Sequence, residues 1–257
     1  MWCTPFQFQS PCSIMMVGPS SCDKTVFVEN LMRERSHLFT PPYNPVVYCY
    51  GANQPTTFER MKKEQGIRFY EGIPDTQLLE KWYKNARGGI LILDDLMRKG
   101  SDDPRVLDLF TRESHHKGIN VVYMTQDMFP KGKHAKTISR NAHYIVAFKN
   151  PRDQLAVRHL TQQAFPQDLK EVMGVYRDAT ERPYGYLLFD LHPNSSDEDR
   201  LKSNLLKSEG YTTVYRKGGI TPSVCVQTGG DGGGRRRKKN RNGGGGRRRK
   251  RKRATAI

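Results

Sequence analysis

The sequence of 257 residues lacks several features that would assign it to a familiar class of protein. It contains no C-x-x-C pair, and its five cysteines are an odd number, so no complete disulfide framework is indicated. No apolar run reaches the roughly 20 residues that a membrane-spanning helix needs. The N-terminus has neither the basic segment nor the long apolar segment of a secretory signal. We therefore expect an intracellular protein with reduced cysteines and no membrane partner.

Acidic residues are also missing from the end of the chain, where basic residues are concentrated. Thirteen of the 43 Lys and Arg residues lie from Arg235 to Arg253, in two blocks that glycines separate. The other 30 face 26 Asp and Glu residues, so residues 1–231 carry a net charge of only +4. Glycine runs and the lack of core-forming residues predict that residues 229–257 are a disordered tail. Such a tail suits a nuclear localisation signal or a nucleic-acid tether without sequence preference, and residues 1–228 are expected to form the folded domain.

A phosphate-binding motif is present near the N-terminus. The segment V-G-P-S-S-C-D-K-T at 17–25 matches the P-loop, or Walker A motif, G-x-x-x-x-G-K-[ST], at every defined position but one. In this motif backbone N–H groups surround the phosphates, the lysine reaches the β- and γ-phosphates, and the hydroxyl binds Mg²⁺. The residues expected to bind ATP are therefore Gly18, Pro19, Ser20, Ser21, Cys22, Asp23, Lys24 and Thr25.

The departure from the motif is Asp23, which stands where the second glycine is expected. A Cβ atom at this position enters a crowded turn, and the carboxylate lies close to phosphate oxygens. We therefore expect Asp23 to weaken nucleotide binding unless a neighbouring group compensates.

Polar side chains follow two apolar segments further along the chain. Asp94 and Asp95 come directly after the apolar run 90–93, which is typical of a Walker B strand. Asp94 is the candidate Mg²⁺ ligand, and Asp95 would orient or deprotonate the attacking water. Gln126 ends the next apolar segment and could hydrogen-bond both the γ-phosphate and that water. An exposed acidic turn is the alternative for the two aspartates, and their co-occurrence with the P-loop argues against it.

Three arginines are candidates for an arginine finger that reaches the nucleotide of a neighbouring subunit. They are Arg112, Arg140 and Arg152. Such a residue stabilises the negative charge of the phosphoryl-transfer transition state. Each could equally be an ordinary surface arginine.

Strand and helix patterns alternate along the chain, which predicts an α/β fold with a mostly parallel sheet covered by helices. Strands are expected at 13–17, 45–50, 67–70, 90–93, 120–125, 143–148 and 185–190, the last of the sheet. Helices are expected at 24–35, 54–65, 76–85, 104–115, 153–163 and 167–176.

From about Ser13 to Leu206, the motifs together resemble the FtsK-HerA type DNA-packaging ATPases of Polinton/Maverick elements, adintoviruses and related DNA viruses. The segments that carry the resemblance are M-V-G-P-S (16–20), I-L-I-L-D-D (90–95), S-H-H-K-G-I-N-V-V (114–122), T-Q-D-M-F-P (125–130) and F-K-N-P-R-D (148–153).

The resemblance implies a RecA-like P-loop NTPase of the ASCE class, in which an added strand lies between the P-loop strand and the acidic strand. Pro45–Tyr50 is the sequence candidate for that strand. It further implies a homo-oligomeric ring that uses ATP and Mg²⁺ to move double-stranded DNA into a capsid. Capsid proteins and a nuclear import receptor are then expected partners, and the host nucleus or the virion is the expected location. The family loop commonly has glycine where this chain has Ser21 and Asp23.

Two other functions remain open from the sequence. Loss of both loop glycines is compatible with a protein that binds nucleotide and DNA with little or no hydrolysis, or with a decayed copy. A small-molecule P-loop kinase is a further alternative, although the Gln126 strand end and the added strand argue against it.

Overall fold

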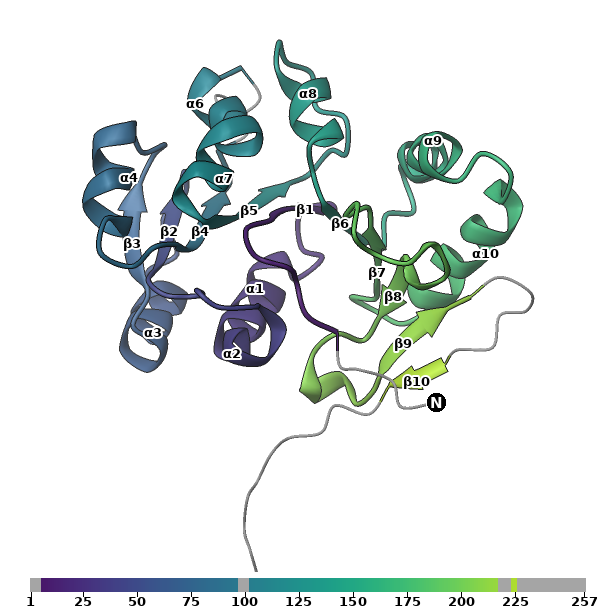
Figure 1. Cartoon of the computed structure of the whole chain (residues 1–257). Coiled ribbons are helices and arrows are strands. Elements are labelled where there is room, and N and C mark those ends of the chain that lie inside the picture. The colour runs from purple at the N-terminus through teal and green to yellow at the C-terminus, as the bar shows by residue number, and fades with distance from the viewer. Residues whose placement is uncertain (1–5, 97–101, 217–222, 226–257) are drawn as a thin grey trace, which may run out of the picture. The chain divides into compact units, whose positions relative to one another are not determined.

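The computed structural model describes residues 6–96, 102–216 and 223–225. All of them belong to one unit, Met1–Gln227. Within these residues ten strands form a single sheet in the order β10-β9-β8-β7-β6-β1-β5-β4-β2-β3, with helices on both of its faces (Figure 1). The segment 229–257, predicted to be a disordered tail, lies outside the described residues.

The elements follow the chain as an alternation of strands and helices up to β7. The strands are β1 (Ser13–Val17), β2 (Val46–Tyr50), β3 (Arg68–Glu71), β4 (Gly89–Asp94), β5 (Ile119–Thr125), β6 (Tyr144–Phe148), β7 (Tyr186–Asp190), β8 (Leu201–Ser203), β9 (Thr212–Tyr215) and β10 (Ser223–Cys225). The helices are α1 (Lys24–Arg33), α2 (Arg35–Leu38), α3 (Pro55–Gln65), α4 (Thr76–Tyr83), α6 (Pro104–Asp108), α7 (Ser114–Lys117), α8 (Ala135–Arg140), α9 (Gln154–Ala164) and α10 (Leu169–Ala179). None of the described helices is long and apolar enough to span a bilayer.

The sheet is parallel from β3 to β6 and antiparallel from β6 to β10. β1 pairs in parallel with both β5 and β6, and β4 pairs in parallel with β5 and β2. Parallel strands end at the same edge of a sheet, so the residues that follow β1, β4 and β5 meet there. The predicted α/β fold with a mostly parallel sheet is confirmed.

The strand between β1 and β4 is β5, not β2. The sequence-based choice of Pro45–Tyr50 for this place is therefore wrong, because β2 lies on the outer side of β4. The order of strands along a chain does not determine their order in the sheet, since each crossover connection can return the chain to either side.

Continuous apolar runs form the central strands because both faces of the sheet are covered. All residues of β1, β4, β5 and β6 are buried. One face packs on α1 and α3 through residues such as Ile14, Val28 and Met61. The opposite face packs on α4, α6, α9 and α10 through residues such as Met15, Leu79 and Val157. The core therefore consists of two apolar layers, and β1 contributes to both.

Three local predictions differ from the structure. The helix expected at 104–115 is interrupted by a π-helical segment, Leu109–Glu113, in which the adjacent side chains of Leu109 and Phe110 are both buried. Helix α8 was not expected, because it is short and lies between turn residues. The sheet also continues beyond β7 with three short strands, whose three or four residues carry little periodic signal.

Candidate functional site

The loop between β1 and α1 requires glycine at its first position. The Gly18 N–H donates to the carbonyl oxygen of Thr125 at the end of β5, at 3.2 Å. A Cβ atom on Gly18 would lie 2.6 Å from Sγ of Cys22 and 2.8 Å from Cβ of Phe148. The close approach of the loop to β5 and β6 therefore excludes any side chain at this position.

The two positions where glycines are replaced both keep a left-handed backbone. Ser21 has φ 65°, and Asp23 has φ 60° and ψ 28°. Glycine adopts this conformation freely, and aspartate tolerates it better than most other residues because its short polar side chain can hydrogen-bond locally. The loop thus has the backbone that glycines would favour, and Asp23 precedes the first residue of α1 without capping it through its side chain.

Lys24, the first residue of α1, is turned back onto the loop. Its Nζ donates to the carbonyl oxygens of Gly18, at 2.5 Å, and Pro19, at 2.9 Å, and approaches Sγ of Cys22 at 3.7 Å. Burial raises the pKa of the Cys22 thiol, and the nearby Lys24 ammonium opposes this increase. The ammonium is thus held at the mouth of the loop, where a phosphate oxygen would compete with the two carbonyls for it.

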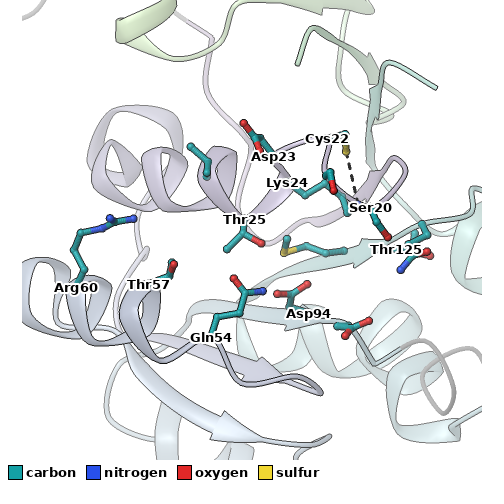
Figure 2. A pocket seen from close by; sticks show the side chains of 15 residues that line it. Ser20, Cys22, Asp23, Lys24, Thr25, Gln54, Thr57, Arg60, Asp94 and Thr125 are labelled. Atoms are coloured by element: carbon teal, nitrogen blue, oxygen red, sulfur yellow. Dashed lines mark hydrogen bonds between the residues drawn. The ribbon is translucent and has the colours of Figure 1, made fainter. Parts of the chain in front are cut away.

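A cavity of about 360 Å³ opens in front of this loop at the carboxyl edge of the parallel strands. Figure 2 shows Thr25 and Asp94 facing each other across it. Its lining consists of residues 20–26 of the loop and α1, residues 94–95 at the end of β4, residues 124–126 at the end of β5, and Gln54, Thr57 and Arg60. The structure therefore brings together the predicted Lys24, Thr25, Asp94, Asp95 and Gln126.

The two aspartates differ in environment although they are adjacent. Asp94 is the last residue of β4 and is 7% exposed, whereas Asp95 is exposed and has a left-handed backbone, with φ 51°. The pKa of Asp94 is raised above its ordinary value, mainly by burial and also by the Asp95 charge, while a hydrogen bond from Tyr48 opposes the increase. Asp94 thus lies in the cavity floor, and Asp95 is open to water at the rim.

The residues at the floor of the cavity have the oxygen donors that Mg²⁺ prefers. One oxygen of Asp94, Oδ2, accepts a hydrogen bond of 2.6 Å from the Tyr48 hydroxyl. The other carboxylate oxygen and the Thr25 hydroxyl are available for a metal ion that keeps most of its own water. Thr25 and Asp94 therefore fit the metal site expected from the sequence.

One wall of the cavity consists of residues that no sequence pattern predicts. The first turns of α3 contribute Gln54, Thr57 and Arg60 to the lining. Arg60 is fixed by the buried Glu29 of α1, with Nη2–Oε2 and Nε–Oε1 distances of 2.5 and 2.7 Å. No motif marks these residues, because α3 reaches the cavity only through the folding of β2 and β3 beside β4.

The predicted arginine-finger candidates lie outside the cavity lining. Arg112 is in the π-helical segment and pairs with Asp108 at 3.7 Å. Arg140 is the exposed last residue of α8, and Arg152 is exposed after β6. A role in a neighbouring subunit stays a prediction for all three.

The sheet order, with β5 between β1 and β4, and the loop and acid pair at one edge define a P-loop NTPase fold of the RecA-like class. No protein-family model and no curated protein sequence matches the chain.

Solved structures with a similar fold include packaging proteins of viruses. The genome packaging NTPase B204 from Sulfolobus turreted icosahedral virus 2, in complex with AMPPCP, is 15% identical and has a TM-score of 0.47, with 75% of this chain and 96% of that chain covered. B204 from Sulfolobus turreted icosahedral virus, a DNA-packaging ATPase, is 12% identical with a TM-score of 0.47, covering 70% of this chain and 92% of that chain. The flagellar accessory protein FlaH from Methanocaldococcus jannaschii is 14% identical with a TM-score of 0.39, covering 53% and 70%. Similarity at this level assigns neither an activity nor a substrate to this chain.

Proposed function

We propose that this protein is an ATP-driven motor that moves double-stranded viral or transposon DNA into a capsid, acting as a homo-oligomeric ring. The observation that carries the ATPase part is the cavity in which Lys24, Thr25, Asp94, Asp95 and Gln126 meet. These residues come from the segments at the carboxyl ends of three neighbouring strands, and they provide groups that could bind the phosphates, hold a metal ion and activate water for in-line phosphoryl transfer.

Each of these residues has a distinct part in the proposed reaction. Backbone N–H groups of the loop hold the phosphates, and Lys24 leaves the loop carbonyls to neutralise the β- and γ-phosphate oxygens. Thr25 and Asp94 would hold Mg²⁺, and the bound ion would neutralise part of the phosphate charge. Asp95, exposed at the rim, accepts the proton of the attacking water, and the Gln126 amide orients that water.

The DNA part of the proposal is supported by the motif resemblance and by the charge of residues 235–253. A motor that moves along DNA of any sequence contacts phosphates rather than base edges. Thirteen basic residues without an acidic neighbour would bind such a backbone, or an import receptor that carries the protein to the nucleus. Capsid proteins are the expected partners at the site of assembly.

A second candidate function is nucleotide and DNA binding with little hydrolysis, and Asp23 is the observation that favours it. The steric reason to expect weak nucleotide binding does not apply, because Asp23 has a left-handed backbone and the loop conformation is retained. The electrostatic reason still applies, since the Asp23 carboxylate lies in the lining of the same cavity. A small-molecule kinase has less support, because Gln126 follows a strand that lies between β1 and β4.

ATP turnover by the purified protein, measured with and without long double-stranded DNA, tests this proposal. We expect DNA to stimulate turnover in the wild type and expect no turnover in Lys24→Ala. Turnover in Asp23→Gly alone would instead support the second function. No turnover in either the wild type or Asp23→Gly would contradict an ATPase motor.

A further inference from the structure

A buried tyrosine lies directly beneath the proposed metal site. Tyr48 of β2 is fully buried, and its hydroxyl donates to Oδ2 of Asp94 at 2.6 Å. The parallel register pairs Tyr48 with Ile92, which lies two residues before Asp94. Since side chains alternate between the two faces of a strand, the side chains of Tyr48 and Asp94 project from the same face of the sheet. Tyr48 does not belong to the cavity lining, and it can affect a bound nucleotide only through its neighbours.

The position of the Tyr48 hydroxyl is fixed by packing. Its ring centroid lies 5.3 Å from that of Phe58 on α3 and 5.3 Å from that of Phe69 on β3. The hydroxyl also approaches Sδ of Met124 on β5 at 3.8 Å. Because two aromatic side chains pack against the buried ring and Met124 lies against its hydroxyl, the tyrosine has a fixed position, and its hydrogen bond constrains the Asp94 carboxylate.

We propose that Tyr48 is a positioning residue of the metal site, holding Oδ2 of Asp94 so that the other carboxylate oxygen is left for Mg²⁺ or its water. The inference rests on the proposed nucleotide function and names the residue that prepares its metal ligand. Removing an outer partner of this kind typically lowers metal affinity about 10-fold to 100-fold.

The test compares Tyr48→Phe, which removes only the hydroxyl, with Tyr123→Phe as a matched control. Tyr123 of β5 is 1% exposed, and its hydroxyl has no hydrogen-bond partner in the described part of the chain. Binding of a fluorescent, non-hydrolysable ATP analogue is titrated over a range of Mg²⁺ concentrations and also in EDTA. We expect Tyr48→Phe to need about tenfold more Mg²⁺ for half-maximal binding, with unchanged binding in EDTA, and Tyr123→Phe to behave as the wild type.

A double-mutant cycle with Asp94→Asn separates positioning from a general effect on folding. If Tyr48 acts through Asp94, adding Tyr48→Phe to Asp94→Asn should not shift the Mg²⁺ requirement further. Thermal melting without nucleotide shows whether each variant is folded. The Mg²⁺ concentrations for half-maximal binding are then compared as ratios between folded variants only. A normal Mg²⁺ requirement in Tyr48→Phe, or additive shifts in the double variant, would overturn the inference. A wild type that binds no analogue at all would overturn the proposed function itself, and the inference with it.

Discussion

Asp23 shows how one residue can depart from a motif while its backbone does not. The last position before Lys24 has a left-handed conformation, which costs most side chains about 1–2 kcal/mol but costs aspartate and asparagine less. Ser21 has the same kind of backbone two residues earlier. The loop keeps this shape although serine and aspartate replace glycine, and the difference that bears on phosphate binding is the charge of Asp23.

Asp23→Asn tests that charge directly, because asparagine keeps the tolerance for the left-handed conformation. Loss of the carboxylate should improve affinity for the ATP analogue by about 1 kcal/mol, or roughly fivefold, through reduced repulsion of the phosphates. Ser21→Gly is the control, since it relieves the backbone without changing charge. Equal affinities of Asp23→Asn and the wild type in equilibrium titrations would contradict the electrostatic explanation.

Substitutions of Lys24 and Asp95 should affect nucleotide binding and ATP hydrolysis differently. We expect Lys24→Ala to abolish nucleotide binding, because no other ammonium group lies at the mouth of the loop in the described residues. Asp95→Asn should bind nucleotide normally and fail to hydrolyse it, because an amide cannot accept the water proton. Binding titrations and single-turnover assays on the same preparations check both expectations. Tight ATP binding by Lys24→Ala would remove the basis of the P-loop assignment.

At the scale of elements, the antiparallel half of the sheet is fastened by buried polar groups. The Glu209 carboxylate accepts from the Tyr186 hydroxyl of β7 at 2.6 Å and from the Leu206 N–H at 2.9 Å. Lys202 of β8 forms a buried ion pair of 2.8 Å with Asp190 of β7. Removing one partner of a buried pair of this kind costs about 3–5 kcal/mol, so Lys202→Met should loosen β8 from β7. Urea unfolding of Lys202→Met and of the double variant with Asp190→Leu would check this, with partial recovery expected in the double variant.

Glu209 should make the stability of this region depend on pH. Burial raises its pKa above the ordinary value of 4.5, with the Glu34 charge adding to the increase and the Tyr186 hydrogen bond opposing it. The folded state therefore holds the proton more tightly than the unfolded chain. This contribution to stability is complete below the unfolded pKa and is lost as pH rises through the folded pKa.

Glu209→Gln removes the titrating proton and keeps an oxygen acceptor. The stability of the wild type relative to Glu209→Gln should therefore increase as pH falls from neutral towards 4.5. Melting temperatures of both proteins across this range measure the difference. A difference independent of pH would show that the carboxyl has the same pKa in the folded and unfolded states.

At the scale of the whole molecule, the folded unit and the basic segment should be separable. Every described residue lies within Met1–Gln227, so deleting residues 232–257 should leave the melting temperature unchanged. The slope of log affinity for DNA against log salt should become shallower, by roughly 0.9 for each phosphate that the basic segment neutralises in the full-length protein. The shortened protein should also leave the nucleus. A chain of equal length with the basic residues of 235–253 changed to glutamine is the control for length, and unchanged DNA binding and localisation in both variants would contradict the proposed role.

Short stretches of the chain were sufficient to predict the residues of the cavity that belong to motifs. The P-loop, the acid pair after a buried strand, the glutamine after the next strand and the alternation of strands and helices are local patterns of composition and period. They located Lys24, Thr25, Asp94, Asp95 and Gln126, which the fold brings to one cavity.

Which distant segments contact one another depends on the complete fold. The fold places β5 rather than β2 between β1 and β4, and it brings α3 to the cavity wall. Tyr48 and Asp94 are 46 residues apart in sequence, and Arg60 and Glu29 are 31 apart, so no periodic pattern connects either pair. The left-handed backbone at Asp23 is likewise imposed by the loop, since an isolated aspartate favours no such conformation. The physical reason is common to all of these features: they arise from packing and hydrogen bonds between segments that are distant in the sequence, so no local sequence pattern reveals them.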